Sequence, residues 1–324
     1  MVTKKRISIA LRFVVSFGLL VLLVWIMRND IGEIANILKG SNKLFFGLGL
    51  SIMVLLTIPI SYRLKLLMKG QKILLSMKDV IYLTFIGFFF NNFLPTAVGG
   101  DIAKAYYASK KTNNKLASYA AVISDRLMGF LSILSIAIVG LIFMGKSLNN
   151  KIIYAVCAVF LFLIVLILFL FSKNIVNTSP PAAGSGSIIN KIKGKLYKLY
   201  SAINLYRNKP VLLAKIFLLS MFMQTCTIVS IYFFILCLGG ELPFLKLFFI
   251  VPLVWAISML PSLNGLGVRE GAFVYFLKGD IGPERAFAIS LLWLGVIIMY
   301  GVIGGVLHLL YPVHPVKKKE KIHK

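Results

Sequence analysis

The apolar residues of this chain gather in long runs separated by short basic segments, a pattern typical of proteins whose helices cross a lipid bilayer. A run of about 20 apolar residues can cross the hydrocarbon core as a helix. Six runs meet this criterion without interruption, at about 7–27, 44–62, 118–144, 152–171, 211–238 and 284–311. Hydrophobic residues make up 59% of the 324 residues, and the mean hydropathy of +0.90 is well above that of a soluble domain. We therefore predict an all-α polytopic membrane protein.

Two further apolar runs are broken in the same way. The run at 80–103 is broken by the string LPTAVG, and the run at 246–277 by the string LPSLNG. In both, a glycine follows four residues after the proline. Backbone without helical hydrogen bonds is tolerated at membrane depth only where it is buried in protein or lines a wet cavity. Paired interruptions in the two halves of a membrane protein therefore indicate a transport site.

The distribution of Lys and Arg indicates which side of the membrane each connecting segment occupies, because basic segments are retained on the cytoplasmic side. Segment 63–79 carries five basic residues and segment 104–115 carries four, so both flanks of the first broken run are predicted to be cytoplasmic. That run must then be a re-entrant hairpin, which returns to the side from which it entered. The same rule, applied to the basic C-terminal tail, makes the second broken run re-entrant from the outer side.

These assignments give one transmembrane domain over residues 1–324, with six full transmembrane helices and two re-entrant helical hairpins. The first half, 7–144, and the second half, 152–311, each contain one hairpin and have opposite orientations, so we predict an inverted repeat. A Pro-, Gly- and Ser-rich stretch followed by basic residues marks 172–210 as a cytoplasmic connector. Both termini are expected in the cytoplasm, and the expected location is the plasma membrane of a prokaryote.

The composition is strongly basic, with 36 Lys and Arg residues against 10 Asp and Glu. Because this charge lies between the apolar runs, topology and attraction to anionic headgroups explain it better than nucleic-acid binding does. The three cysteines, Cys157, Cys226 and Cys237, have a spacing that fits neither a metal site nor a disulfide framework. The three histidines do not cluster in the sequence. We therefore expect no metal, no cofactor and no nucleic-acid partner.

Ionisable residues inside apolar runs are costly to place in lipid, so each of them is a candidate for function. In the first half the candidates, with the polar and glycine residues beside them, are Asn91, Asn92, Gly99, Gly100, Asp101, Asp125 and Arg126. Asp101 follows the break, where it would either cap the next helix or face a ligand. The glycines allow the backbone to approach a ligand or another helix closely. The asparagines could contact a headgroup or satisfy open carbonyls of the hairpin.

Asp125 and Arg126 are neighbours near the start of a predicted crossing. Adjacent side chains on a helix point about 100° apart, so the two residues are not expected to pair with each other. Each then needs a partner elsewhere. Arg126 could extend to the membrane interface or hold a phosphate with two parallel hydrogen bonds.

The second half carries its candidates in the string NGLGVREG. They are Asn264, Gly265, Gly267, Arg269 and Glu270. The free N–H groups at a helix N-terminus favour anions, and an arginine at the same place makes a phosphate site attractive. Glu270 could orient the arginine, contact an ammonium group or take a proton. The alternative is a structural ion pair that clamps the two hairpins together, such as Arg269 with Asp101.

The strings NNFLP, VGGD and NGLGVREG, together with the Asp125-Arg126 pair, resemble the transmembrane region of the lysylphosphatidylglycerol synthase family, also called the UPF0104 group. The resemblance extends over essentially the whole chain. In the multiple peptide resistance factor proteins, a domain of this kind is fused to a soluble aminoacyl-transfer domain, and the resemblance implies that it flips the modified lipid. The residues that match the family's motif positions are Asp101, Arg126, Arg269 and Glu270. Because the chain ends soon after its last predicted crossing, we expect the transport part without synthase chemistry.

The leading expectation is a flippase or scramblase that moves a phosphate-bearing lipid, aminoacylated and polyprenyl lipids included, between leaflets. Its partner would be a membrane phospholipid or lipid phosphate, and a homo-oligomer is compatible with the sequence. We do not expect an enzyme. Two alternatives stay open at this point: an integral membrane transferase that acts on a lipid-phosphate carrier, and a secondary transporter of small solutes.

Overall fold

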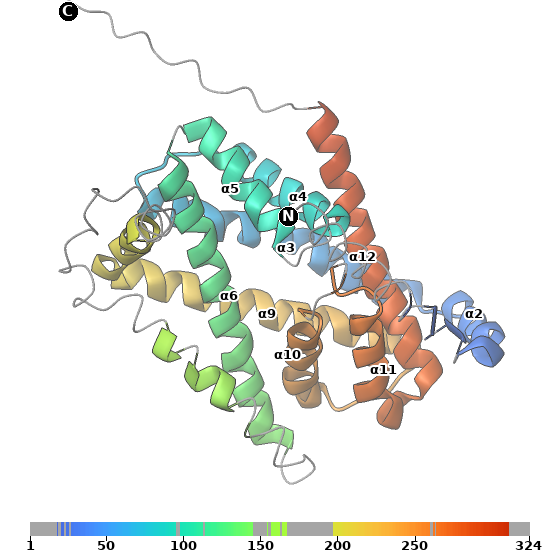
Figure 1. Cartoon of the computed structure of the whole chain (residues 1–324). Coiled ribbons are helices and arrows are strands. Elements are labelled where there is room, and N and C mark those ends of the chain that lie inside the picture. Colours follow the sequence, from blue (N-terminus) through green and yellow to red (C-terminus); the bar gives the residue numbers. More distant parts are fainter. Residues whose placement is uncertain are drawn as a thin grey trace, which may run out of the picture.

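The computed structural model describes residues 27–94, 98–112, 114–144, 197–259, 262 and 264–310, with short pieces within 18–25 and 154–166. The regular elements of this part of the chain are helices (Figure 1). Four of them are long and apolar enough to cross a membrane. They are α3 (Lys43–Gly70), α6 (Lys115–Met144), α9 (Pro210–Cys237) and α12 (Pro283–Leu310).

These four helices coincide with four of the predicted crossings, and the described part of this membrane protein is all-α. Large apolar side chains project from the outer faces of the helices, for example Leu55, Leu218 and Leu309 with exposures of 61%, 66% and 83%. Exposed apolar surface on this scale is typical of contact with lipid. The predicted crossings at 7–27 and 152–171, and most of the predicted connector at 172–210, lie outside the described residues.

Both broken runs form two helices with an interruption between them. The first pair is α4 (Met77–Phe93) and α5 (Gly99–Thr112), and the second is α10 (Leu247–Ile257) and α11 (Val268–Ile281). The interruption of the first pair begins at Leu94, whose ψ of 132° is extended. The helical region is disfavoured for a residue before proline, which favours the end of α4 there. Proline alone does not decide it, because α3 and α10 continue through Pro59 and Pro252. Shorter elements with defined bounds in the described part are the 3-10 turns η1 (Arg28–Asp30), η3 (Leu205–Asn208) and η4 (Phe244–Lys246), and the helix α2 (Ile31–Lys39); residues 197–204 are also helical.

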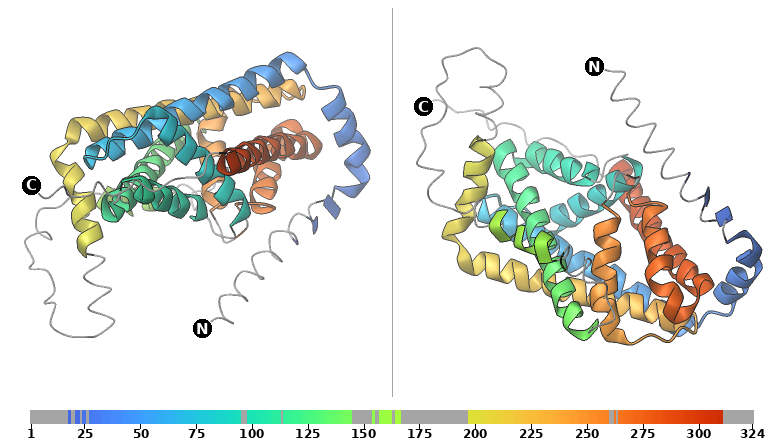
Figure 2. Two further views of the ribbon diagram at one scale, coloured as in Figure 1. Left: turned by 90° about the horizontal axis from the view of Figure 1, so that it is seen from above. Right: turned by 60° about the horizontal axis from the view of Figure 1, so that its bottom comes forward.

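The helices pack in corresponding ways in the two halves. Helix α3 packs along α9, and the two lie lengthwise beside each other (Figure 2, left). Within each half, α5 packs against α6 and α11 against α12. Between the halves, α4 packs against α12 and α10 packs against α6. With the contacts α4–α5 and α10–α11, these helices form a closed ring of six neighbours.

Glycine permits both of the ring contacts that join the two halves. A Cβ atom added at Gly140 of α6 would overlap the backbone of Phe248 and Phe249 in α10. A Cβ atom added at Gly304 of α12 would overlap the backbone carbonyl group of Phe85 in α4. Small residues allow helix backbones to approach closely where lipid offers no hydrophobic driving force. The same device therefore fixes both crossing points.

Candidate functional site

The helices enclose a cavity of about 360 Å³. Its walls come from α3, α4, α5, α6, α9, α10, α11 and α12. The polar and charged residues that line it are Arg63, Asn91, Asn92, Asp101, Lys104, Asp125, Arg126, Gln224, Thr227, Ser258, Asn264 and Arg269. A volume of this size is within the range of small-molecule sites. The cavity brings ionisable residues from distant parts of the sequence into one place.

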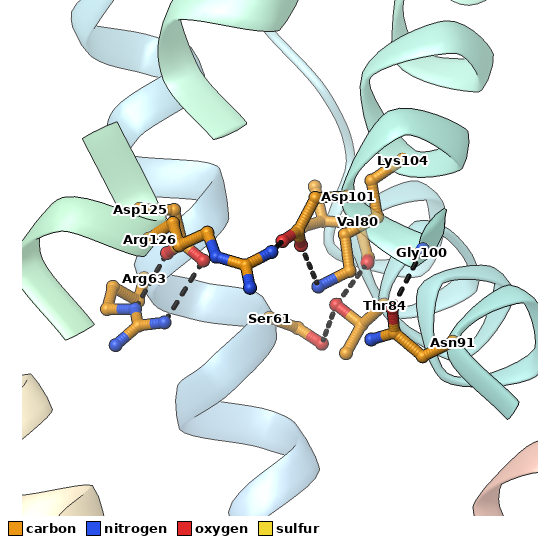
Figure 3. A network of polar contacts seen from close by, with 10 residues as sticks. All are labelled: Ser61, Arg63, Val80, Thr84, Asn91, Gly100, Asp101, Lys104, Asp125 and Arg126. Carbon is orange, nitrogen blue, oxygen red and sulfur yellow. Dashed lines mark hydrogen bonds and ion pairs between the residues drawn. The ribbon is translucent and has the colours of Figure 1, made fainter. Parts of the chain in front are cut away.

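The carboxylate of Asp101 lies between two cations. Arg126 of α6 donates from Nη1 to Asp101, and the Nζ atom of Lys104 lies 3.5 Å from the other carboxylate oxygen (Figure 3). Helix α5 begins at Gly99, so Asp101 occupies the first turn and not the cap position, and the expectation of a plain cap is wrong. The N-terminal end of a helix favours a negative charge in this turn. Asp101 therefore joins the start of α5 to α6.

Asp125 and Arg126 have separate partners, as predicted. Arg63 of α3 donates to Asp125 with both Nε and Nη2, at 2.7 and 3.0 Å, and its Nη1 atom donates to the Ser220 hydroxyl of α9 at 2.9 Å. Such paired hydrogen bonds are the strong form of an arginine–carboxylate contact. Arg63 thus joins three helices and has little freedom to change partners.

The end of α4 holds the start of α5. The backbone N–H of Gly100 donates to the Asn91 side-chain oxygen at 2.8 Å. A Cβ atom at Gly100 would overlap the carbonyl oxygen of Gly87, so only glycine lets α5 begin so close to α4. Asn91 thus accepts a free N–H at the start of α5, whereas the predicted role was to satisfy open carbonyls of the hairpin. Gly100 allows the close approach of a helix, as predicted.

A hydrogen bond joins the last turn of α4 to the turn that precedes α11. The Nδ2 atom of Asn264 donates to Oδ1 of Asn92 at 2.7 Å, and Asn92 in turn donates to the carbonyl oxygen of Ile297 in α12 at 2.7 Å. The turn that carries Asn264 has positive φ angles of 48° at Asn264 and 80° at both Gly265 and Gly267. Residues other than glycine and asparagine rarely adopt positive φ angles, which explains the NGLG string.

The guanidinium group of Arg269 binds residues of its own segment, Glu270 and Asn264. Its Nε and Nη2 atoms donate to one carboxylate oxygen of Glu270 at 3.1 and 2.5 Å, and its Nη1 atom donates to the carbonyl oxygen of Asn264 at 3.3 Å. The other oxygen of Glu270 accepts the backbone N–H of Gly267 at 2.6 Å. The Arg269 side chain is 6% exposed and that of Glu270 is fully buried. The suggested ion pair of Arg269 with Asp101 is therefore wrong, because each residue has a nearer partner.

The cavity gathers more than half of the predicted site residues. Those that line it are Asn91, Asn92, Asp101, Asp125, Arg126, Asn264 and Arg269. The others, which shape the turns and helix starts beside it, are Gly99, Gly100, Gly265, Gly267 and Glu270. Sequence reasoning missed Arg63 and Lys104, which it had counted as topology signals. Both residues lie in helices that continue past the predicted boundaries, to Gly70 and Thr112. The apolar runs alone do not indicate these helix ends.

Aromatic rings flank the cations of the cavity. The Nζ atom of Lys104 lies 5.9 Å from the centre of the Phe88 ring, and the guanidinium carbon of Arg126 lies 5.3 Å from that of Phe130. On another wall, Trp255 and Trp293 meet edge to face with their ring centres 6.1 Å apart. Ring faces attract cations and replace part of their hydration.

The architecture defines a class of protein: an integral membrane protein in which interrupted helices surround a charged cavity. The chain belongs to the lysylphosphatidylglycerol synthase TM region family, whose model matches residues 9–305. It is also similar to the UPF0104 membrane protein PH1989 of Pyrococcus horikoshii. The two are 26% identical over 267 residues, and the match covers 74% of this chain and 79% of the relative. The family resemblance inferred from the motifs is confirmed.

Proposed function

We propose that this protein is a flippase or scramblase that moves a phosphate-bearing lipid between the leaflets of a prokaryotic plasma membrane, without a chemical step. The observation that carries the proposal is the cavity itself: it lies among membrane helices, and its charged walls contain Arg63, Lys104, Arg126 and Arg269 against the carboxylates of Asp101 and Asp125. A cavity rich in cations suits an anionic headgroup. The family to which the chain belongs supports lipid as the substrate class.

The lengths of the interrupted helices support a re-entrant arrangement. Helix α10 has 11 residues and α11 has 14, which correspond to about 16 and 21 Å at about 1.5 Å per residue. The hydrocarbon core is about 30 Å thick, so neither helix crosses it alone without a steep mismatch. The corresponding contacts α4–α12 and α10–α6 support an inverted repeat. We propose six full crossings, two re-entrant hairpins and cytoplasmic termini.

The physical advantage of the cavity is that it replaces water around a charged headgroup. An unpaired charge in hydrocarbon costs many kcal/mol, so a bare phosphate crosses a bilayer very slowly. A headgroup in the cavity would meet guanidinium, ammonium and amide groups while its acyl chains stay in lipid. Exposure of the cavity to each leaflet in turn would complete the transfer.

The test is a translocation assay in reconstituted vesicles. Phosphatidylglycerol with a fluorescent label on one acyl chain is placed in both leaflets, and dithionite is added outside to reduce the accessible label. Vesicles without protein should lose only the fluorescence of the outer leaflet, whereas vesicles with the protein should lose nearly all of it. The variant Lys110→Gln, which removes an exposed charge on α5 outside the cavity, should behave as the wild type. A wild-type trace that matches protein-free vesicles would contradict the proposal.

A further inference from the structure

We infer that Arg126 and Lys104 together bind the phosphate group, and that Asp101 is the exchangeable counter-ion that this phosphate replaces. The inference rests on the proposed function and assigns the site within it. It also gives Arg269, the residue that the sequence motif favours most, a positioning role and not a direct contact with phosphate.

The balance of charge places the excess at Asp101. Among the side chains that line the described cavity, Arg63 pairs with Asp125, and Arg269 pairs with Glu270 just behind the wall. The remaining cations, Arg126 and Lys104, share the one carboxylate of Asp101. One positive charge in this cluster is thus not neutralised by a carboxylate of the cavity. An excess charge in a site of reduced dielectric attracts an anion strongly.

The contacts of Lys104 indicate that Asp101 only partly satisfies it. The distance of 3.5 Å between Lys104 Nζ and Asp101 is longer than a good hydrogen bond. The aliphatic part of Lys104 lies over Gly87, where any Cβ atom would overlap it. The ammonium group is therefore held in place by packing and by the Phe88 ring, and it keeps donor capacity for an anion.

Arg126 is the accessible arginine of the cavity. Its side chain is 26% exposed, against 11% for Arg63 and 6% for Arg269. A guanidinium group offers paired donors that match a phosphate, and the Phe130 ring supports it from one side. Arg63 and Arg269 already use their donors on fixed partners of the protein. Because its side chain is the most exposed of the three, Arg126 is the arginine that an entering anion reaches most readily.

Exchange with Asp101 also explains how a bound headgroup can leave. A transport site must bind well enough to admit its substrate and weakly enough to release it. When Asp101 returns to Arg126 and Lys104, it competes with the phosphate and lowers the net affinity. Removal of this competitor should make binding tighter, which is the opposite of what loss of an ordinary substrate contact would cause.

Binding can be measured by tryptophan fluorescence. The chain has three tryptophans, and Trp255 and Trp293 both line the cavity. In a Trp25→Phe background, the detergent-solubilised protein is titrated with short-chain phosphatidylglycerol and, separately, with inorganic phosphate. Asp101→Asn should lower the Kd for the lipid about tenfold, the equivalent of one charge-assisted hydrogen bond. Arg126→Gln and Lys104→Gln should each raise it at least about tenfold, while Lys110→Gln leaves it unchanged.

The titration with inorganic phosphate separates a lipid site from a free-phosphate site. We expect saturation with the lipid, and a much weaker response to inorganic phosphate that follows the same order of variants. Tighter binding of inorganic phosphate than of the lipid would overturn the lipid assignment. A Kd in Asp101→Asn that equals or exceeds the wild-type value would overturn the exchange, and this variant cannot produce its expected gain by misfolding.

The vesicle assay distinguishes failure of this inference from failure of the proposed function. If the wild type does not translocate lipid, the proposed function fails. If the wild type translocates and Arg126→Gln and Lys104→Gln do so equally fast, only the assignment of the phosphate site fails.

Discussion

In each interrupted helix pair, a carboxylate in the first turn of the second helix is paired with an arginine, but the arginine comes from a different place in the two pairs. In the first, Asp101 at the start of α5 forms ion pairs with Arg126 of α6 and with Lys104 of its own helix. In the second, Arg269 and Glu270 are neighbours that bind each other and their own turn. The first cluster is partly open to the cavity and carries excess charge, whereas the second is closed and neutral. An arginine–carboxylate pair thus gives a candidate exchange site in the first case and a structural contact in the second.

The largest effect should come from breaking the closed pair. Glu270→Gln leaves Arg269 buried without its counter-ion and weakens the hydrogen bond to Gly267, so we expect a loss of about 3–5 kcal/mol in unfolding free energy. Thermal unfolding in detergent measures it. The matched control is Lys246→Met, which breaks the more exposed ion pair with Asp280 and should cost little. If Glu270→Gln keeps the wild-type stability but loses lipid translocation, the Arg269–Glu270 pair contacts the substrate and does not have a mainly structural role.

A smaller effect, of a different kind, is expected at the open cluster. Arg126→Gln should lower the rate of lipid translocation about tenfold, equivalent to about 1.4 kcal/mol, because it removes the accessible anion-binding donor. Because the Arg126 side chain is partly exposed, the substitution should change the unfolding free energy of the protein by less than about 1 kcal/mol. For Arg126→Gln the loss of translocation rate should be large relative to the loss of unfolding free energy, whereas for Glu270→Gln the loss of unfolding free energy should dominate. A large stability loss with proportionate loss of transport would show that both clusters are scaffolds.

The contact between the two pairs should have a modest energy. A double-mutant cycle of Asn92→Ala and Asn264→Ala should give a coupling of about 0.6 kcal/mol, with an upper range near 1.7, as for other polar contacts between membrane helices. Thermal unfolding of the wild type, both single variants and the double variant supplies the four values. A coupling of zero would mean that the end of α4 and the turn before α11 are in contact without stabilising each other.

The smallest effect should arise at the base of the first pair, where Asp79 accepts from Lys111 and from the backbone of Ser76. Burial raises the pKa of Asp79, but the hydrogen bonds and charge of Lys111 and the contacts of Ser76 outweigh it, so the pKa lies below the usual 3.8. Because the folded-state pKa is depressed, the stabilisation is present above about pH 3.8 and is lost as the pH falls through the lower folded-state value. Asp79→Asn should remove this acid sensitivity and cost less than about 1 kcal/mol at neutral pH. Unfolding curves at pH 3 and pH 6 for both proteins provide the check.

The sequence predicts the interruptions well because their causes are local. Leu94 precedes a proline, and Gly265 and Gly267 adopt positive φ angles, so the residues at each break favour it. Ion-pair partners are a different matter, because they depend on helices far apart in the chain. The pairing of Arg63 with Asp125, 62 positions apart, could not be read from either segment alone. Arg63 was also assigned to a loop, because the apolar run weakens near residue 62 while α3 continues to Gly70.

The closed ring of α4, α5, α6, α10, α11 and α12 restricts how the cavity can change shape. A closed chain of neighbours has no loose end, so a gap between any two members must be matched by tilting or sliding at others. The crossings at Gly140 and Gly304 hold backbones against each other, and they can act as pivots while the bulkier contacts slide. Each sequence half is therefore in contact with the interrupted helix pair of the other half. A movement of one half would therefore have to change contacts that the other half makes in the same ring.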